Sequence, residues 1–366
     1  MKLRPLFFLM TLAVASCSKP ASETLTIDVA ELASAPAEDS FSWEDIASVD
    51  GFFELDPDHT MILGGYLFYE DYADGLLLIG DPQNKNILSV DESGRIVSTV
   101  SRSGNGPQEY LGMSSSFFLP DGNIALRDAM KNKEFVYRPD GTFVSSVDSF
   151  GYDGYVFSDG SRALMEMNSM EDKDKRQFRV YSAQGDTLLA GPAVDPGQKI
   201  FVLNGGHFMA DGPDACWFCY MDSDTLYHVR PQAYAPAVIF THGSQTTYGE
   251  TAGMNVDDGK VRISMNRGRF QHYDRFVTGR YFIYQMMDTE LKKNHFAVYR
   301  TDTQQRLYHS AEAPVARVNG TEVQLWPIFV KDGLIWCRVS RDSAPLLIKD
   351  YDDDSNDVLV RLRLKR

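Results

Sequence analysis

The sequence is poor in the features that mark enzymes and nucleic-acid binders. It has four cysteines and seven histidines in 366 residues, and neither a Gly-x-Ser-x-Gly elbow nor a His-Glu-x-x-His motif occurs. Lys and Arg number 36 against 51 Asp and Glu, so the formal net charge of −15 disfavours nucleic acid and anionic surfaces as partners. Stretches with a 3.6-residue period are scarce, whereas Tyr and Phe are abundant, and this favours an all-β protein. We expect no cofactor and no metal.

The cysteines give little support to redox or zinc chemistry. Cys216 and Cys219 have Cys-x-x-Cys spacing, but they lie in the strand-like run ACWFCYMD, where positions i and i+3 point to opposite faces. A thioredoxin-type pair sits at the start of a helix, and a zinc site needs a second pair of ligands at suitable spacing. We therefore expect Cys216, Cys219 and Cys337 to be buried free thiols.

The N-terminus has the pattern of a secretion signal. MKLRPLFFLMTLAVASC starts with basic residues, continues with a short apolar run, and ends in small residues before Cys17. VASC resembles the lipobox of bacterial lipoproteins; an ordinary secretion signal with a chance cysteine is the alternative. The resemblance implies that residues 1–16 are removed, that Cys17 is lipidated, and, because Ser18 is not Asp, that the anchor lies in the outer membrane. Residues 17–40, rich in Ala, Ser and Pro, are expected to form an unpacked tether.

One unit of sequence is repeated six times. Each copy has a β-rich run, a tight turn, a second β-rich run, and then Asp or Asn. The turns are Asp74-Gly75, Asp121-Gly122, Asp159-Gly160, Asp211-Gly212, Thr278-Gly279 and Asp332-Gly333. The terminal residues are Asp81, Asp128, Asn168, Asp222, Asp288 and Asp342, which are expected to cap a second turn through backbone N–H groups. Asp-Gly between apolar runs is the strongest short-range signal for a β-hairpin.

A third β-rich run follows each unit, and often a fourth. The third runs are NILSV, EFVYR, QFRVY, TLYHV, HFAVY and PLLIK. Four antiparallel strands repeated in this way predict a six-bladed β-propeller over residues 41–366, with blades starting near residues 66, 114, 155, 206, 275 and 326. A β-sandwich would not repeat one hairpin signature six times, and β-helix repeats are much shorter. The last blade needs an outer strand, either from DVLVRLRLK at the C-terminus or from GFFELD near residues 51–56, and we favour the N-terminal segment.

Two short motifs resemble a known family. SGNGPQEY is similar to the Gly-x-Gly-Pro-Gly-Glu-Tyr signature of six-bladed β-propeller lipoproteins of Bacteroides-type Gram-negative bacteria, relatives of NHL-repeat propellers, with Gln108 in place of the third glycine. NDVLVRLRLK resembles the family's C-terminal Asn-Pro-x-Leu-Val motif, with Asp357 in place of proline. The resemblance implies the propeller fold and localisation at the outer membrane, and it implies no catalytic motif.

The stretch SRSGNGPQEY, residues 101–110, is interpreted as a crossing between blades 1 and 2. It lacks the third glycine of a dinucleotide-binding loop and the Gly-Lys-Ser/Thr ending of a phosphate-binding loop. Gly104 and Gly106 permit a turn, and Pro107 fixes its φ. Crossings can also line a ligand face, so Arg102 and Tyr110 are candidate ligand contacts.

The longest interval between blades holds a basic insertion. From residue 255 to 280 it has six basic and three acidic residues, a charge of +6 − 3 = +3 in an acidic chain. Arg262, Arg267 and Arg269 are candidate contacts for an anionic ligand, because guanidinium forks suit carboxylate, sulfate or phosphate. The alternative is that they pair with acidic neighbours within the protein. Among the histidines, His207 is the best candidate for the rim of the channel.

The run DYDDDSND, residues 350–357, resembles part of a calcium loop. Asp352, Asp354 and Asn356 have the spacing of its first three ligands, but Gly at position 6 and Glu at position 12 are missing. A solvated turn is the favoured interpretation. The sequence as a whole favours a membrane-attached binding module for a glycan, peptide or protein, and a propeller-type hydrolase or lyase with an axial site is the alternative.

Overall fold

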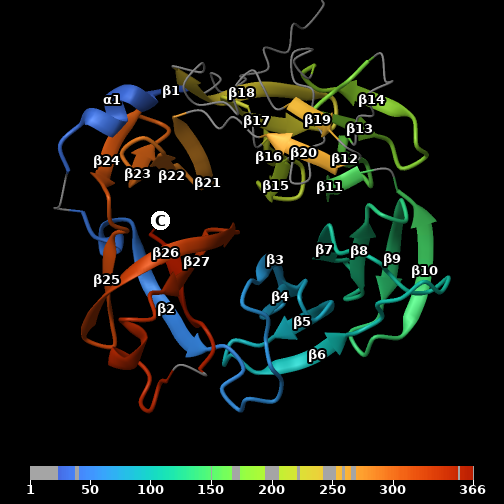
Figure 1. Ribbon diagram of the computed structural model, residues 1–366, viewed down its shortest axis with the longest axis horizontal. Helices are drawn as coiled ribbons and strands as arrows, with labels where there is room; N and C mark the ends of the chain where they lie inside the picture. Colours follow the sequence, from blue (N-terminus) through green and yellow to red (C-terminus); the bar gives the residue numbers. More distant parts are fainter. Residues whose placement is uncertain are drawn as a thin grey trace, which may run out of the picture.

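A computed structural model of the protein describes residues 24–37, 41–149, 151–166, 174–193, 206–220, 223–241, 253–257, 260–264, 269–352 and 355–365. Within these residues, six β-sheets form a ring around a central opening, and a two-stranded hairpin stands apart from them (Figure 1). The predicted fold, an all-β propeller with six blades, is confirmed.

The first five blades have four antiparallel strands each, in sequence order from the channel outward. Blade 1 contains β3 (Phe68–Ala73), β4 (Leu76–Asp81), β5 (Asn86–Val90) and β6 (Ile96–Val100). Blade 2 contains β7 (Ser115–Phe118), β8 (Ile124–Asp128), β9 (Lys133–Tyr137) and β10 (Phe143–Asp148). Blade 3 contains β11 (Gly151–Val156), β12 (Arg162–Glu166), β13 (Phe178–Tyr181) and β14 (Thr187–Ala190). Blade 4 contains β15 (Gly206–Ala210), β16 (Cys216–Tyr220), β17 (Thr225–Arg230) and β18 (Ala233–Thr241), and blade 5 contains β21 (Phe270–Thr278), β22 (Tyr281–Asp288), β23 (Lys293–Arg300) and β24 (Gln305–Ser310).

Blade 6 joins the two ends of the propeller. From the channel outward it contains β26 (Thr321–Lys331), β27 (Leu334–Val339), β28 (Val358–Leu364) and β2 (Ala47–Glu54), and β25 (Val315–Val318) pairs with the start of β26. The favoured closure by the N-terminal segment is confirmed, because β2 is the outermost strand. The prediction that PLLIK forms the third strand is wrong: its first two residues belong to the 3₁₀ helix η2 (Ala344–Leu346), and Pro345 has no N–H to donate to a sheet.

The glycine of every predicted hairpin turn has a positive φ, and in blades 1 and 6 the preceding Asp has one too. Asp74 and Gly75 have φ values of 50° and 81°, and Asp332 and Gly333 have 51° and 74°. Positive φ at both central residues is the type I′ geometry, whose twist matches that of paired strands.

In blades 1 and 2 the residue that ends the repeat unit ties the blade to the crossing before it. Asp128 Oδ1 accepts hydrogen bonds from the backbone N–H groups of Met130 (2.9 Å) and Lys131 (3.1 Å), and Oδ2 accepts one from Leu111 in the crossing (2.6 Å). Asp81 holds its turn and its crossing in the same way. Asp342 is exposed, because η2 follows β27 in place of a tight turn. Asp288 Oδ1 accepts hydrogen bonds from Glu290 N and Leu291 N and so caps its turn, while Asn168 and Asp222 lie outside the described residues.

Part of the expected tether belongs to the fold. β1 (Leu25–Asp28) pairs in parallel with β18, the outermost strand of blade 4, and leads into α1 (Val29–Ser34), whose first turn is capped by the Asp28 side chain. Leu25, Ile27, Val29 and Leu32 are buried. The prediction that residues 17–40 lie unpacked is therefore corrected for residues 24–37, where apolar side chains recur often enough to cover the neighbouring blades.

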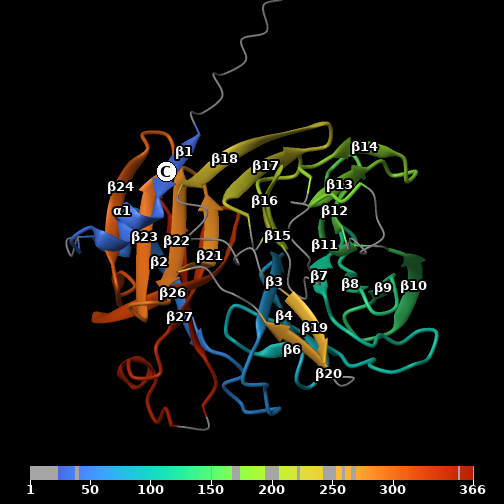
Figure 2. The ribbon, with the colours of Figure 1, turned by 45° about the horizontal axis from the view of Figure 1, so that its top comes forward.

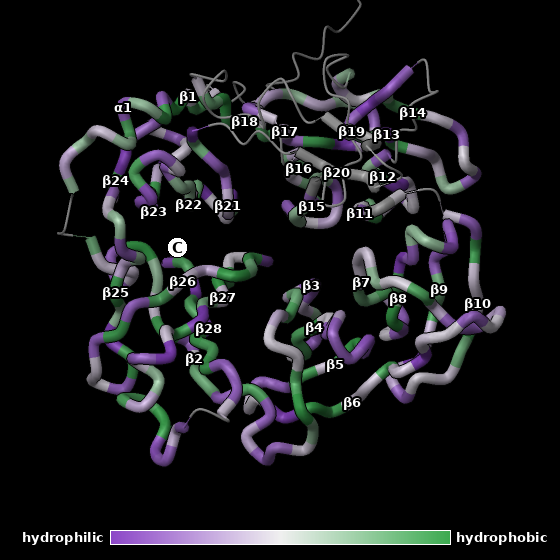
Figure 3. Tube along the Cα trace, in the orientation of Figure 1, coloured by the Kyte–Doolittle hydropathy of each residue, from purple (hydrophilic) through white to green (hydrophobic). Residues whose placement is uncertain are grey.

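The apolar core is divided among the spaces between blades. Hydrophobic residues are distributed around the whole ring (Figure 3), and separate clusters fill the interfaces of blades 1 and 2, 3 and 4, and 6 and 1. The largest cluster joins blades 4, 5 and 6 to β1, α1 and the 3₁₀ helix η1 (Trp43–Asp45). None of the clusters joins blades 2 and 3 within the described residues.

A buried ionic seam holds blades 2 and 3 together. Arg127 of β8 is fully buried, and its Nε lies 3.2 Å from Glu134 Oε2 of β9. Arg162 of β12 reaches the other oxygen of Glu134 at 3.1 Å. Gly154 of β11 makes room for the Arg127 guanidinium, since a Cβ there would lie 2.6 Å from Nη1. We call Arg127, Glu134 and Arg162 the ionic seam.

The insertion between blades 4 and 5 forms the separate hairpin. Its strands are β19 (Gly253–Asp257) and β20 (Lys260–Ser264), and the hairpin stands off the ring (Figures 1 and 2). Helices are short: no described one has the length and apolar character needed to cross a membrane.

Candidate functional site

Bulges in the innermost strands turn acidic side chains toward the channel. The pairing register shifts between Tyr69 and Asp71 in β3, between Gly151 and Gly154 in β11, and between His272 and Arg275 in β21. Within these three bulges lie Glu70, Asp153 and Asp274. A bulge redirects a side chain that regular pleating would send to the face of the blade.

Several of these carboxylates connect two blades, because they accept hydrogen bonds from backbone N–H groups of a neighbouring blade. The innermost strand of a blade has one edge without a partner strand, so its channel-side N–H groups need other acceptors. Glu70 Oε2 accepts a hydrogen bond from Ser116 N of blade 2 at 3.2 Å, and Asp153 Oδ2 accepts one from Phe208 N of blade 4 at 2.9 Å. Asp71 in β3 likewise accepts from Phe118 N at 2.8 Å.

Two of the channel carboxylates, Glu70 and Asp274, have raised pKa values. Burial raises the pKa of Glu70 to about 8, and the charges of Asp153 and Asp71 act in the same direction. Burial raises the pKa of Asp274 to about 6, against the opposing influence of His207 and the guanidinium groups nearby. Perturbed acids of this kind mark functional sites, although structural networks also produce them.

His207 lies at this level of the channel. It is exposed, and its Nδ1 lies 3.6 Å from Asp153 Oδ2. The structure thus brings the predicted rim histidine together with two acids that the sequence analysis did not single out. A signal existed: in each of these three strands a Tyr directly precedes the acidic residue, in FYEDY, GYDGY and HYDRF, where an innermost strand would otherwise continue its apolar pattern. The bulge in the innermost strand of blade 6, between Pro327 and Phe329, holds no acid.

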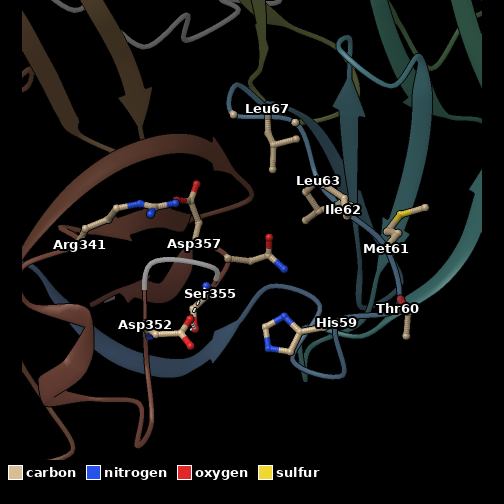
Figure 4. Close-up of a pocket in the computed structure, with 13 residues that line it drawn as sticks. His59, Thr60, Met61, Ile62, Leu63, Leu67, Arg341, Asp352, Ser355 and Asp357 are labelled. Carbon is tan, nitrogen blue, oxygen red and sulfur yellow. Dashed lines mark hydrogen bonds between the residues drawn. The ribbon is translucent and has the colours of Figure 1, made fainter.

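A second concave site lies between blades 6 and 1. This cavity, which we call the groove, has a volume of about 830 Å³. One wall is the segment 59–67 that leads into β3, and the other is the segment around Asp352, Ser355 and Asp357 that leads into β28, together with Arg341 (Figure 4). The two walls are nearly 300 positions apart in the sequence, so no local sequence motif predicts the groove.

The 59–67 wall is held rigidly although it is not a strand. Met61 N donates to Asp56 Oδ2 at 3.0 Å, Gly64 N donates to Asp81 Oδ2 at 3.0 Å, and the Ile62 carbonyl accepts from Asn84 Nδ2 at 2.9 Å. Because the backbone groups are occupied by the protein itself, the side chains of this wall are presented in a fixed arrangement.

The same wall exposes apolar side chains. Ile62 is 91% exposed, and next to the groove Tyr66 is 68% and Phe68 37% exposed. The rings of Tyr66 and Phe68 meet edge to face with centroids 5.0 Å apart. A cluster of exposed apolar groups beside a cavity is typical of a binding surface.

The opposite wall is polar. Asp357 Oδ2 accepts a hydrogen bond from Tyr69 OH at 3.2 Å and lies 3.7 Å from Arg338 Nη1. Asp352 Oδ1 accepts hydrogen bonds from Ser355 N and Oγ, at 3.0 and 3.2 Å, which is how an acidic side chain closes a turn. The favoured interpretation of this run as a turn agrees with these contacts, while Asp354 lies outside the described residues.

The crossing at residues 101–110 is a packed structural element. Tyr110 is fully buried, and its hydroxyl donates to the carbonyl oxygen of Lys85 (2.6 Å), with the Val100 carbonyl oxygen 3.1 Å away, so it does not face a ligand. Lys131 Nζ donates to three carbonyl oxygens of the crossing. Gly104 approaches the Glu109 carboxylate so closely that a Cβ would lie 2.0 Å from Oε2.

The exposed part of this crossing faces the outer side of the ring. Arg102 is exposed, and its Nε donates to the Gly141 carbonyl at 3.0 Å. It borders a small hollow of about 160 Å³ together with Gln108 and Phe143, the latter in the outermost strand of blade 2. Arg102 therefore lies away from both the channel and the groove.

The basic insertion is shorter than the sequence suggested. Residues 270–278 form β21, so Arg275 is an innermost-strand residue, whose guanidinium donates to the carbonyl oxygens of Ser223 and Tyr220 in blade 4 at 2.9 and 3.0 Å. Arg269 binds Asp288 Oδ2 through Nη2 (2.8 Å) and lies over the Phe270 ring. The alternative of internal pairing thus holds for Arg269.

The remaining predicted residues are placed as follows. Arg262 lies in β20, and Arg267 lies outside the described residues. Cys216, Cys219 and Cys337 are free and buried, as expected, and burial raises their thiol pKa values. Among the described residues, no group of three or more His, Cys, Asp or Glu is arranged to hold a metal ion.

Comparison with known proteins points to one architecture. A family model described as "6-bladed beta-propeller" matches residues 60–335. A candidate exported protein from Bacteroides fragilis is similar in structure, with 16% identity, a TM-score of 0.65, and coverage of 94% of this chain and 100% of that one. A member of the duf4221 family from Bacteroides vulgatus has 11% identity and a TM-score of 0.50, with 87% and 98% covered. Such identities show the fold alone, and no curated protein matches the chain.

Proposed function

Because the chain belongs to the 6-bladed beta-propeller family, we propose that it is a recognition module attached to the outer membrane through lipid on Cys17, with the groove as its binding site. The observation that carries the proposal is the groove itself: a cavity of about 830 Å³ with one rigid, apolar, exposed wall and one polar wall. Cavities of roughly 300–1,000 Å³ that combine apolar lining with a few placed polar groups are typical of ligand sites.

The ligand we propose is an extended peptide segment with apolar side chains. Ile62 and its apolar neighbours offer contact area that water covers unfavourably, and binding would remove it from water. Polar groups on the other wall, among them Asn356 and Arg341, can bond a peptide backbone. A preformed wall lowers the entropy cost of binding, because the side chains are already ordered.

Selection from a library of displayed 12-residue peptides, beside a panel of neutral and anionic oligosaccharides, tests this function. We expect selected peptides to carry apolar residues and to lose at least tenfold in affinity for Ile62→Asp. The matched control is Val144→Asp, which changes an exposed valine on β10. Equal binding to both variants would exclude the groove, and binding of oligosaccharides alone would exclude a peptide as the ligand.

Attachment is tested separately. Cys17→Ser should move the protein from the membrane fraction to the soluble envelope fraction, because the modified thiol is lost. If the Cys17→Ser protein still sediments with membranes, the lipid anchor is wrong, whatever the groove binds.

A second candidate function, acid–base catalysis of hydrolysis or elimination at the axis, is favoured by one observation. Asp274, with a pKa raised by burial to about 6, and His207 act on each other electrostatically in the channel. A group that titrates near the working pH suits general acid–base catalysis. Turnover of any substrate in a chromogenic glycoside and ester panel, with a pH profile that Asp274→Asn abolishes, would support an enzyme over a binding module.

A further inference from the structure

The N-terminal segment enters the fold at the outer edge of blade 4. β1 pairs with Val238–Thr241, the second half of β18, and Thr24 Oγ1 donates to the Pro236 carbonyl at 3.2 Å just before it. Only seven positions separate Cys17 from Thr24. Seven residues span about 25 Å at most, even when fully extended. A lipid on Cys17 would therefore hold blade 4 close to the membrane.

We propose that the outer edge of blade 4 is the membrane-facing surface of the propeller, and this rests on the proposed anchor at Cys17. The part of β18 that β1 leaves uncovered, residues 233–236, is exposed along its whole length and carries no charge. It includes Tyr234, 37% exposed, a residue type that suits the boundary between headgroups and water. We call residues 233–236 the blade 4 edge.

The position of the tether, rather than the apolar character of an edge, determines which edge of the ring faces the membrane. The outer strands of blades 1 and 2 also expose apolar side chains, among them Val97 and Val144. A compact chain of this length has a radius of gyration of roughly 20 Å and is about 50 Å across. β6 lies on the side of the ring opposite β18 (Figures 1 and 2), so with blade 4 tethered against the membrane the edge of blade 1 projects away from it.

This orientation has two favourable consequences. The protein has a formal net charge of −15, so an uncharged edge is the surface that anionic lipid repels least. The groove, between blades 6 and 1, lies on the side of the ring away from the tether and stays open to a ligand.

The experiment uses the full-length lipidated protein, purified from cells and reconstituted into phosphatidylethanolamine and phosphatidylglycerol vesicles that contain a nitroxide-headgroup lipid. A fluorophore is attached to Ala235→Cys in the blade 4 edge or, as the matched control, to Val97→Cys in β6. The native thiols at positions 216, 219 and 337 are buried, so the introduced cysteine is the one that reacts. We expect at least twofold stronger quenching at position 235 than at position 97.

A variant with a longer tether tests whether the short native tether is what holds blade 4 near the membrane. Thirty Gly and Ser residues inserted between Ser18 and Thr24 raise the average reach from roughly 15 Å to roughly 33 Å, and the quenching ratio should fall toward one. Equal quenching at positions 235 and 97 in the protein with its native tether, or stronger quenching at 97, would overturn the orientation while leaving the anchor intact. A mass showing unmodified Cys17 would overturn the anchor of the proposed function, and the orientation with it.

Discussion

At the scale of single residues, a bulge in a channel strand allows an acidic side chain to bond the backbone of the neighbouring blade. Glu70 is displaced by a bulge, reaches the backbone of the next blade, and lies among other carboxylates. Its hydrogen bond to Ser116 N favours the charged form, whereas burial and the charges of Asp71 and Asp153 favour the neutral form. Burial has the larger effect, so the folded protein holds a proton that the unfolded chain would release.

Glu70→Gln should therefore stabilise the protein in a pH-dependent way. The pKa of Glu70 is raised from 4.5 to about 8, so the folded state binds the extra proton between these pH values and stability falls as pH rises through them. Glutamine keeps an acceptor for Ser116 N without that loss. We expect little change near pH 4.5 and a gain on the order of 1–3 kcal/mol at pH 8, measured by urea denaturation.

The control for this prediction is Glu31→Gln, which changes an exposed carboxyl on α1. A gain for Glu70→Gln that does not vary with pH would show that the effect is one of packing. A loss of stability at pH 8 would mean that the charged form is the one the channel favours.

At the scale of elements, the sequence predicted what depends on neighbours in the chain and missed what depends on distant ones. Asp-Gly turns placed the hairpins, because each of these turns needs a residue with positive φ and glycine adopts it without strain. The blade terminators were recognised for the same local reason. PLLIK was misassigned because its apolar character resembles a strand, while Pro345 favours a 3₁₀ turn. The groove could not be predicted, since it forms between segments far apart in the chain, and the only local signal of the bulges was the Tyr that precedes each acid.

The ionic seam between blades 2 and 3 supplies a prediction at this scale. Glu134→Gln leaves Arg127 buried without its counter-charge and should cost about 3–5 kcal/mol. The double variant Arg127→Met with Glu134→Leu removes both charges and should recover most of that loss, because two desolvated ions are replaced by apolar contacts.

An exposed pair provides the comparison for the seam. Arg95 and Asp58 form an ion pair at 3.3 Å with side chains 64% and 62% exposed, so Arg95→Met should change stability by less than about 1 kcal/mol. Chemical denaturation of the four proteins measures all of these effects. A double variant as unstable as Glu134→Gln would mean that the seam needs its charges for packing.

At the scale of the whole molecule, the N-terminal segment has two separable roles. β1 and α1 cover apolar surface on blades 4 and 5, and β2 closes the ring against β28. Covering a surface adds stability in proportion to the area buried, whereas closing a ring removes the exposed edges that an open arc would have.

Two truncations should separate these roles. Deletion of residues 18–37 removes β1 and α1 and should lower the free energy of unfolding by a few kcal/mol while one cooperative transition remains. Deletion of residues 18–54 also removes β2, exposes the edge of β28, and should abolish the cooperative transition and promote aggregation. Thermal melts followed by circular dichroism distinguish the outcomes, and equal melting temperatures for both deletions would exclude closure by β2.

Closure by β2 also dictates when the molecule can finish folding during its synthesis. Ala47 pairs with Leu364, a separation of 364 − 47 = 317 positions, so β2, made early, must wait for β28, the last strand made. At roughly 5–20 residues per second, a ribosome takes about 15–60 seconds to cover that distance. Throughout this time the growing chain is an arc with an unpaired strand at its beginning. A chain released a few residues too early lacks the partner that β2 needs, and a chain threaded through a membrane pore can stay unclosed until its final segment has passed.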